Sequence, residues 1–218
     1  AYILPWGGID DIRFLSEIYQ HNIVARVSVE PFEIKKKRFD RGTIILTRKS
    51  NENLGDRFDD IIKKAANKFN RPITSVESGF VSKGKDFGSS SMRVIRKPKI
   101  GIISGNGVSS YSFGEVWHFF ERQIEFPVSV IGSDYFSGIP KHNFDVIILP
   151  SGNHSYINNE LREDLRIWVR SGGKLILMDG AINAFVDKKG FGLKKFATDE
   201  EKKKKEEKDK SMKTVSYT

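Results

Sequence analysis

The chain has no cysteine among its 218 residues. This absence excludes disulfide bonds, thiolate metal sites and cysteine nucleophiles, but it leaves the cellular compartment open. The chain also lacks any run near the roughly 18 apolar residues that a membrane-spanning helix needs. Its first residues, Ala1–Trp6, lack the basic segment of a signal peptide and are typical of the interior of a domain. We therefore expect the sequence to be a piece of a longer protein.

Basic residues outnumber acidic ones, and the formal net charge is +9. Seven lysines lie in residues 198–218, but six acidic residues are interspersed with them, so this segment carries little of the excess. Such mixed charge is typical of a solvated segment, so we expect 199–213 to be exposed and to contribute little to stability. The basic run Lys35–Arg38 lies between apolar stretches and predicts the tip of a hairpin. Neither run favours a nucleic-acid partner.

Apolar segments alternate with amphipathic ones through the second half of the chain. Helical spacing of apolar residues predicts helices over 113–124 and 161–169. Continuously apolar strands between such helices indicate a parallel sheet that is covered on both faces. The predicted strands cover residues 99–103, 128–131, 145–149 and 174–178.

The first half shows a similar order of shorter elements, which predicts a smaller α/β region. Its predicted helices are 9–19 and 58–69, and a Gly- and Ser-rich connector follows at 79–91. Its predicted strands are 2–4, 23–29, 43–47 and 72–76. The chain thus divides into a small α/β region with its connector (1–97), a parallel-sheet domain (98–197) and a charged tail (198–218).

The loop Gly105-Asn106-Gly107 opens a predicted helix, as a phosphate cradle does. Ser110 stands where the fingerprint G-x-G-x-x-G has its third glycine, and the nearest acidic residue after the second strand is Asp134. A tight strand-to-helix turn is the favoured interpretation. A site for phosphate or another small ligand is the alternative.

Other polar residues follow neighbouring strands of the same predicted sheet. Ser112 and Glu115 have the spacing of a capping box, and Glu115 is also a candidate pocket acid. Ser151 and His154 suggest a hydrolase pair but lack the G-x-S-x-G context, so a turn is favoured. Parallel strands deliver their following loops to one edge, where we expect the Glu115 carboxylate to lie near the Asp179–Gly180 turn. The candidate pocket residues are Gly105, Asn106, Gly107, Ser110, Glu115, Ser151, Gly152, His154, Asp179 and Gly180.

His118 and Glu121 have the H-x-x-E spacing of a carboxypeptidase zinc site. A zinc site needs a third protein ligand, and the downstream histidines His142 and His154 fall in other loops of the predicted sheet. We therefore interpret His118 and Glu121 as the polar side of an amphipathic helix. We expect no metal and no cofactor in this chain.

Three segments of the second half carry a resemblance to a known superfamily: 98–103 (PKIGII), 144–152 (FDVIILPSG) and 172–177 (GGKLIL). Residues 98–197 resemble a class I glutamine amidotransferase-like domain of flavodoxin-like fold, the superfamily that includes the ThiJ/PfpI proteins. In active relatives the last of these strands leads into a strained elbow that bears a cysteine partnered by a histidine. Here the elbow is Asp179-Gly180-Ala181. The activity of that superfamily is therefore not expected, and no residue is assigned as catalytic.

A second resemblance covers nearly the whole chain and rests on 112–121 (SFGEVWHFFE), 132–136 (GSDYF), 39–43 (FDRGT) and 79–81 (GFV). These segments resemble the C-terminal half of bacterial zinc carboxypeptidases of the carboxypeptidase A-like class. The resemblance implies a periplasmic or secreted parent whose zinc ligands and catalytic Glu lie upstream of this sequence. It also implies a non-catalytic accessory role here, with the upstream peptidase domain as partner. The alternatives are a small-ligand or phosphate-binding domain and a hydrolase whose nucleophile is Asp179 or Ser151.

Overall fold

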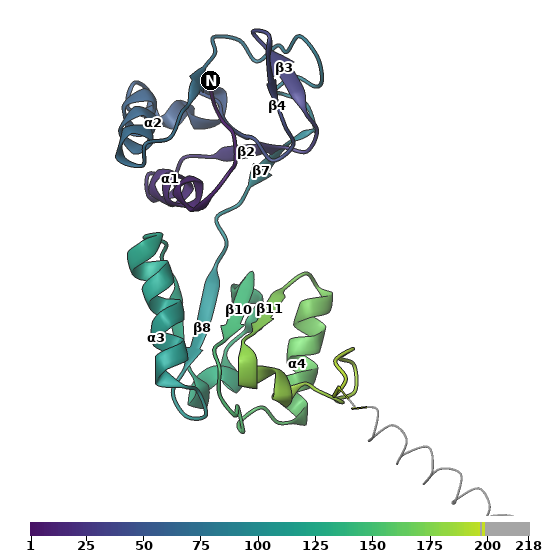
Figure 1. Cartoon of the computed structure of the whole chain (residues 1–218). Helices are drawn as coiled ribbons and strands as arrows, with labels where there is room; N and C mark the ends of the chain where they lie inside the picture. The colour runs from purple at the N-terminus through teal and green to yellow at the C-terminus, as the bar shows by residue number, and fades with distance from the viewer. Residues whose placement is uncertain (197, 199–218) are drawn as a thin grey trace, which may run out of the picture.

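The computed structural model describes residues 1–196 and 198. It shows an α/β protein of two lobes, joined by one chain crossing between β7 (Met92–Ile95) and β8 (Ile100–Ser104) (Figure 1). No helix within the described residues is long and apolar enough to cross a membrane. The tail segment 199–213, expected to be exposed, lies outside the described residues.

The first lobe is a five-stranded antiparallel sheet in the order β6-β1-β5-β2-β7. Two helices cover one face, where Phe14 and Ile62 pack against Leu46 in a buried apolar cluster. Its elements are β1 (Tyr2–Leu4), α1 (Ile9–Gln20), β2 (Ala25–Ser28), β5 (Ile44–Leu46), a 3-10 segment (Lys49–Leu54), α2 (Arg57–Lys68), β6 (Thr74–Ser75) and β7. The predicted strands and helices of this half are confirmed, while the edge strand β7 was not predicted.

A hairpin covers the other face of this sheet. Its strands are β3 (Phe32–Ile34) and β4 (Lys37–Phe39), and the two residues between them, Lys35 and Lys36, both have positive φ. Two such residues form the turn that matches the twist of hairpin strands, so the predicted hairpin tip is confirmed. Phe32 stacks on Phe39 with ring centroids 5.2 Å apart, and both lie in a buried cluster with Ile45.

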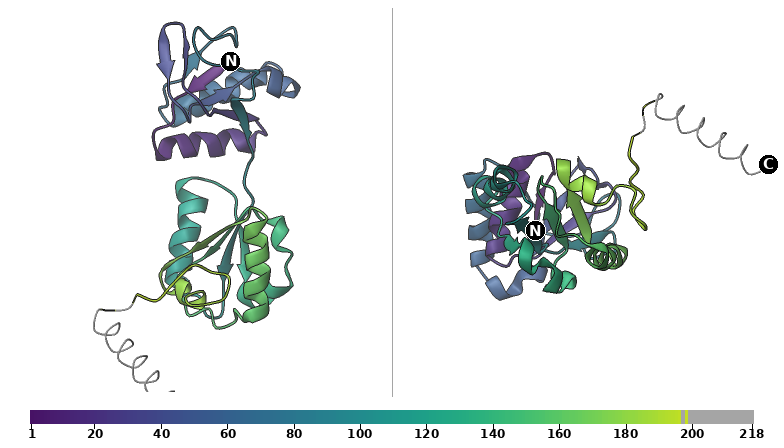
Figure 2. Two further views of the ribbon diagram at one scale, coloured as in Figure 1. Left: turned by 90° about the vertical axis from the view of Figure 1, so that its right-hand side faces the viewer. Right: turned by 90° about the horizontal axis from the view of Figure 1, so that it is seen from below.

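The second lobe is a four-stranded parallel sheet in the order β11-β10-β8-β9. Helix α3 packs with Ile102 and Ile148 on one face, and α4 packs with Ile103 and Ile147 on the other (Figure 2). After β8 its elements are α3 (Ser110–His118), a π-helical turn (Phe119–Gln123), β9 (Ser129–Gly132), 3-10 segments (Ser133–Gly138 and Lys141–Asn143), β10 (Val146–Leu149), α4 (Asn159–Arg170), β11 (Lys174–Leu177) and a final 3-10 segment (Asp179–Ala184). The predicted parallel sheet with helices on both faces is confirmed.

The predicted capping box of Ser112 and Glu115 is wrong. The N-cap of α3 is Ser109, whose Oγ accepts a hydrogen bond from the backbone N–H of Ser112 at 3.3 Å. The Oγ of Ser112 instead accepts from the backbone N–H of Ser151 at 3.0 Å. This hydroxyl therefore ties the first turn of α3 to the loop after β10 and does not cap the helix.

The two lobes touch where α1 faces the end of the π-helical turn that follows α3. Arg13 Nε donates to the carbonyl of Gln123 at 2.6 Å. Ser16 Oγ and Gln20 Nε2 both donate to the carbonyl of Glu125, at 2.8 and 3.1 Å. One apolar cluster also continues from the helix-covered face of the first sheet to the α3 face of the second. The chain crossing is therefore supported by both polar and apolar contacts.

A buried ammonium group organises the segment after β9. The Nζ of Lys141 donates to the carbonyls of Phe136, Ser137 and Ile139 at 2.6, 3.2 and 2.8 Å. Only 8% of Lys141 is exposed, and burial lowers its pKa below the ordinary value despite the nearby charge of Asp164. This side chain fixes the loop that carries Ser133 and Asp134.

We predict that Lys141→Met lowers the free energy of unfolding. Methionine fills the space but donates no hydrogen bond, and a buried carbonyl without a donor costs about 1–3 kcal/mol. Lys174→Met is the matched control, because the Lys174 side chain is exposed on β11 and has no described partner. Equal midpoints of chemical denaturation for the two variants would contradict this role of Lys141.

Candidate functional site

The strand order brings two loops together at the carboxyl edge of the second sheet. Strands β8 and β10 are central neighbours, and the chain leaves β8 toward one edge strand and β10 toward the other. Loops at such a switch point are where open α/β sheets bind ligands. Val108 and Gly152 form an isolated bridge, and the backbone N–H of Ser109 donates to the carbonyl of Ser151 at 2.7 Å.

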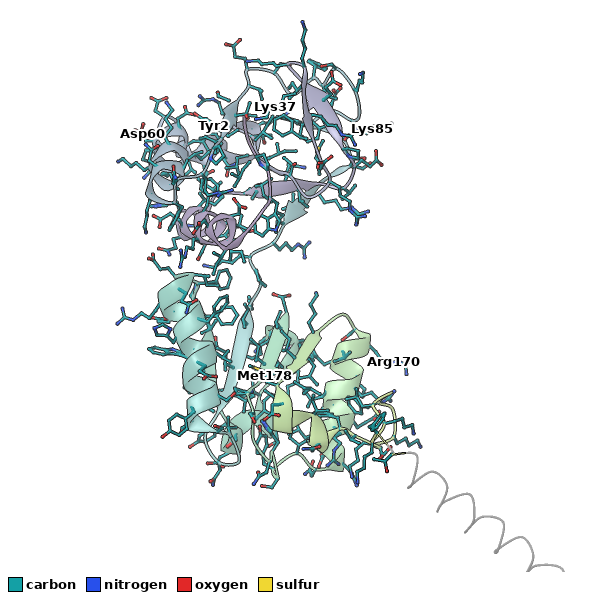
Figure 3. All side chains as sticks on the ribbon, viewed as in Figure 1. Tyr2, Lys37, Asp60, Lys85, Arg170 and Met178 are labelled. Carbon is teal, nitrogen blue, oxygen red and sulfur yellow. The ribbon has the colours of Figure 1, made fainter. Side chains whose placement is uncertain are left out.

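A third loop joins them from β11. Met178, labelled in Figure 3, directly follows this strand and leads into Asp179, which has a φ of +43°. Ser151 Oγ donates to Asp179 Oδ2 at 2.7 Å. This hydrogen bond, and a second one from the backbone N–H of Gly180, lower the pKa of the Asp179 carboxyl below its ordinary value. Asp179 is therefore an ionised acceptor held in a left-handed turn.

Three glycines let these loops approach one another backbone to backbone. A Cβ on Gly152 would overlap the carbonyl oxygen of Gly107, and a Cβ on Gly180 would lie 2.9 Å from the carbonyl oxygen of Gly152. Gly107 also has a φ of +76°, which disfavours other residues. The loops occupy much of the space at this edge with their own backbone, and none of the three cavities described below is lined by them.

His154 does not face Ser151. Its Nε2 lies 2.7 Å from the carbonyl oxygen of Pro150, and its Nδ1 lies 2.7 Å from the hydroxyl of Tyr156. Burial lowers the pKa of His154 below the ordinary value of 6.5, with the Pro150 hydrogen bond opposing it. The neutral ring therefore donates from Nε2 to Pro150 and accepts at Nδ1 from Tyr156. Both ring nitrogens are used to fold the loop, which fits the favoured interpretation of Ser151 and His154 as a turn and not the alternative of a hydrolase pair.

The remaining predicted residues fall into two groups. Gly105 approaches the loop after β9, where its Cβ position lies 3.1 Å from Ser133 Oγ, while the side chains of Asn106 and Ser110 are exposed. Glu115 is exposed on α3, and its carboxylate makes no described interaction with the Asp179–Gly180 turn. The structure thus brings the predicted loops together but does not join Glu115 to them.

His118 and Glu121 are both exposed, on the last turn of α3 and on the π-helical turn. This exposure fits their interpretation as the polar side of the helix. Over residues 1–196 and 198, no group of three or more His, Cys, Asp or Glu side chains is arranged to hold a metal ion.

The first lobe contains a cavity of about 880 Å³ that was not predicted from the sequence. Its polar lining comes from β2, from the loop after β5 and from the segment that follows β6. The lining residues are Ala1, Tyr2, Arg26, Thr47, Arg48, Lys49, Ser50, Ser75, Val76, Glu77, Ser78, Gly79, Phe87 and Gly88. One local signal exists, the run Thr47–Ser50 of basic and hydroxyl residues directly after an apolar strand. Two smaller cavities, about 430 and 210 Å³, lie beside the chain crossing and beside α4.

Comparisons with known proteins give little for this chain. No family model matches its sequence, and no curated protein matches it. A solved structure that is similar to it is the formyltetrahydrofolate deformylase from Burkholderia mallei ATCC 23344, with 12% sequence identity and a TM-score of 0.24. The match covers 81% of this chain and 57% of the deformylase chain. A likeness this weak carries no argument about function.

We predict that Gly152→Ala destabilises the protein by about 1–3 kcal/mol or more, the range for overpacked substitutions, because a methyl group cannot coexist with the Gly107 carbonyl. Gly114→Ala is the matched control within the same lobe. A Cβ on Gly114 meets nothing within 4 Å, and alanine favours a helix over glycine by up to about 1 kcal/mol. Chemical denaturation should therefore shift the two midpoints in opposite directions. A neutral Gly152→Ala would show that the loops are not held as described.

His154 also predicts a pH dependence of stability. Between the lowered pKa of the folded state and the ordinary value of 6.5, the unfolded chain binds a proton that the folded chain does not. The free energy of unfolding should therefore fall as the pH decreases below 6.5, by at most about 1.4 kcal/mol per pH unit. His154→Gln should show a smaller slope over the same range, measured by urea denaturation. Identical slopes for both proteins would refute this assignment.

Proposed function

We propose that this chain is a non-catalytic accessory module of a larger, exported zinc carboxypeptidase, and that it packs against the upstream peptidase domain. The carboxypeptidase-like segments, 112–121 and 132–136 among them, support the identity of the parent. One structural observation carries the non-catalytic role: the turn after β11 holds Asp179, which already accepts a hydrogen bond from Ser151. The zinc belongs to the upstream domain in this proposal.

The chemistry of this edge supports the absence of catalysis. A serine nucleophile needs a base that can take its proton. Among the residues that the structure describes, the group that accepts from Ser151 Oγ is the Asp179 carboxylate, and a carboxyl with a lowered pKa is a weak general base at neutral pH. His154, which has the better pKa for this task, is buried and engaged elsewhere. The carboxyl edge of the second sheet therefore has the loop arrangement of a ligand site but no activated nucleophile.

The described structure also favours a scaffold role for the second lobe. Two backbone hydrogen bonds hold its loops to one another, from Ser109 to Ser151 and from His154 to Gly107. A surface whose backbone groups are already paired keeps its shape when it meets another domain. The accessory role therefore depends on shape and stability more than on reactivity.

We predict that the isolated chain releases no ammonia from glutamine and binds no stoichiometric zinc. In the longer protein, Asp179→Ala and Ser151→Ala should leave the kcat of carboxypeptidase activity within about twofold, because neither residue takes part in the reaction. His118→Ala should leave the zinc content unchanged, measured by elemental analysis after dialysis.

The gene sequence upstream of the codon for Ala1 tests whether the parent protein is a zinc carboxypeptidase. Reading it should reveal a peptidase domain with its own zinc ligands, and its absence would overturn the proposed parent. Ammonia release that disappears in Asp179→Ala would instead overturn the non-catalytic role. If the isolated chain binds one zinc ion and His118→Ala loses it, the proposal that zinc belongs to the upstream domain would be overturned.

A further inference from the structure

The cavity of the first lobe lies against the face of the sheet that α1 and α2 leave free. Arg26 on β2 pairs with Ile45 of β5 and with Val94 of β7. Its side chain therefore lies on the same face as Ile45, which belongs to the apolar cluster under the β3–β4 hairpin. The hairpin covers only part of this face, and Val94 remains 49% exposed. Arg26 therefore lines the cavity from the face of the sheet that the hairpin covers only in part.

Arg26 is held in place without a counter-ion. Its Nε donates to Ser50 Oγ at 3.2 Å and its Nη1 donates to the carbonyl of Met92 at 3.1 Å. These bonds leave further N–H groups of the guanidinium unassigned. Among the described residues, no carboxylate lies within ion-pair distance of this half-buried group. A fixed, partly desolvated positive charge of this kind favours an anion.

Arg48, the other arginine of the cavity, differs from Arg26 because it has a carboxylate partner. Arg48 also lines the cavity, but it forms an ion pair with Asp59, whose other oxygen accepts from the hydroxyl of Tyr2 at 2.7 Å. Tyr2 is labelled in Figure 3 beside α2. Because its charge is matched within the protein, Arg48 contributes less to anion binding than Arg26 does.

Ser50 offers a hydrogen-bond donor beside Arg26. Its Oγ accepts two hydrogen bonds, one from Arg26 Nε and one from Thr47 Oγ1 at 2.9 Å. Thr47 Oγ1 is itself fixed as an acceptor from the backbone N–H of Ser50 at 3.3 Å. With both acceptor positions of Ser50 used, its own hydrogen is free to donate. A guanidinium and a hydroxyl donor thus lie side by side at the cavity wall.

The rest of the lining suits a small organic molecule. Val76 and Phe87 are buried and provide an apolar wall, while Lys49 adds an exposed positive charge. Of the described residues that line the cavity, Glu77 alone is acidic, and it is exposed. The volume of about 880 Å³ lies within the range of known small-molecule sites, about 300–1,000 Å³.

We propose that this cavity is a binding site for a small organic anion, whose carboxylate or phosphate binds Arg26 and Ser50 while its apolar part rests on Val76 and Phe87. A guanidinium binds either group through two parallel N–H bonds, and such charge-assisted bonds are about twice as strong as neutral ones. This inference does not depend on the proposed parent protein or on the second lobe.

The test measures the binding of three probes to the intact chain by isothermal titration calorimetry. Hippurate and phenyl phosphate each carry an aromatic group and an oxyanion, while hippuramide has the same body as hippurate without the charge. We expect both anions to bind and hippuramide to bind at least about tenfold more weakly, because one charge-assisted hydrogen bond contributes about 1.5–3 kcal/mol. The tighter of the two anions identifies the class of natural ligand.

Arg26→Gln and Ser50→Ala should each weaken the binding of the anions, the first by at least about tenfold. Arg93→Gln is the matched control, since Arg93 is an exposed arginine on β7 whose register partner Val27 lies on the helix-covered face. It removes the same charge from the same lobe and should change affinity by less than about twofold. Ser50→Ala keeps every charge and guards against misfolding of Arg26→Gln.

Three results would overturn the proposal. One is no binding of either anion to the unmodified chain. Another is equal binding of hippurate and hippuramide. The third is a loss of affinity in Arg93→Gln as large as that in Arg26→Gln, which would indicate attraction to the overall charge of the lobe.

Discussion

The carbonyl oxygen of Gly107 occupies the place where a side chain on residue 152 would begin, and the carboxyl edge of the second sheet depends on this contact. Because glycine leaves the space free, the loops after β8 and β10 meet through their backbones and Ser109 bonds to Ser151. The turn after β11 then packs on Gly152. The result is an edge with the topology of a ligand site but with its polar groups largely engaged with one another.

The strands and helices of the second lobe were predictable because continuous apolar runs alternate there with helical apolar stripes. The strand order was not predictable from these runs, since each strand shows the same pattern. The start of α3 shows a second limit: Ser109 and Ser112 are the same residue type three positions apart. Only the fold decides between them, because Ser112 is taken by the backbone of Ser151. His154 shows the same limit, since both partners of its ring come from tertiary packing.

In the first lobe, too, some features follow from the local sequence and others depend on contacts between distant segments. The turn at Lys35 and Lys36 follows from a short polar break between apolar strands, which is a local signal. Strand β7 is as long as β2, and its place in the sheet comes from pairing with the edge of β2, which is a non-local contact. The cavity is assembled from segments far apart in sequence, and nothing near Arg26 in the sequence shows that its guanidinium lacks a carboxylate partner in the described structure.

The contact between the lobes has a consequence for which sequence changes the protein tolerates. On the side of the second lobe, three of its hydrogen bonds are accepted by the main-chain carbonyls of Gln123 and Glu125, which every amino acid carries, and one is accepted by the Glu125 carboxylate from Lys68. The side chain at position 123 is therefore free to vary without loss of its hydrogen bond, whereas Glu125 has a φ of +49° and its carboxylate pairs with Lys68. What matters is the path of the chain through the π-helical turn, which contains one residue more per hydrogen-bonded ring than an α-helix does. A one-residue deletion there would uncouple the lobes more effectively than most substitutions.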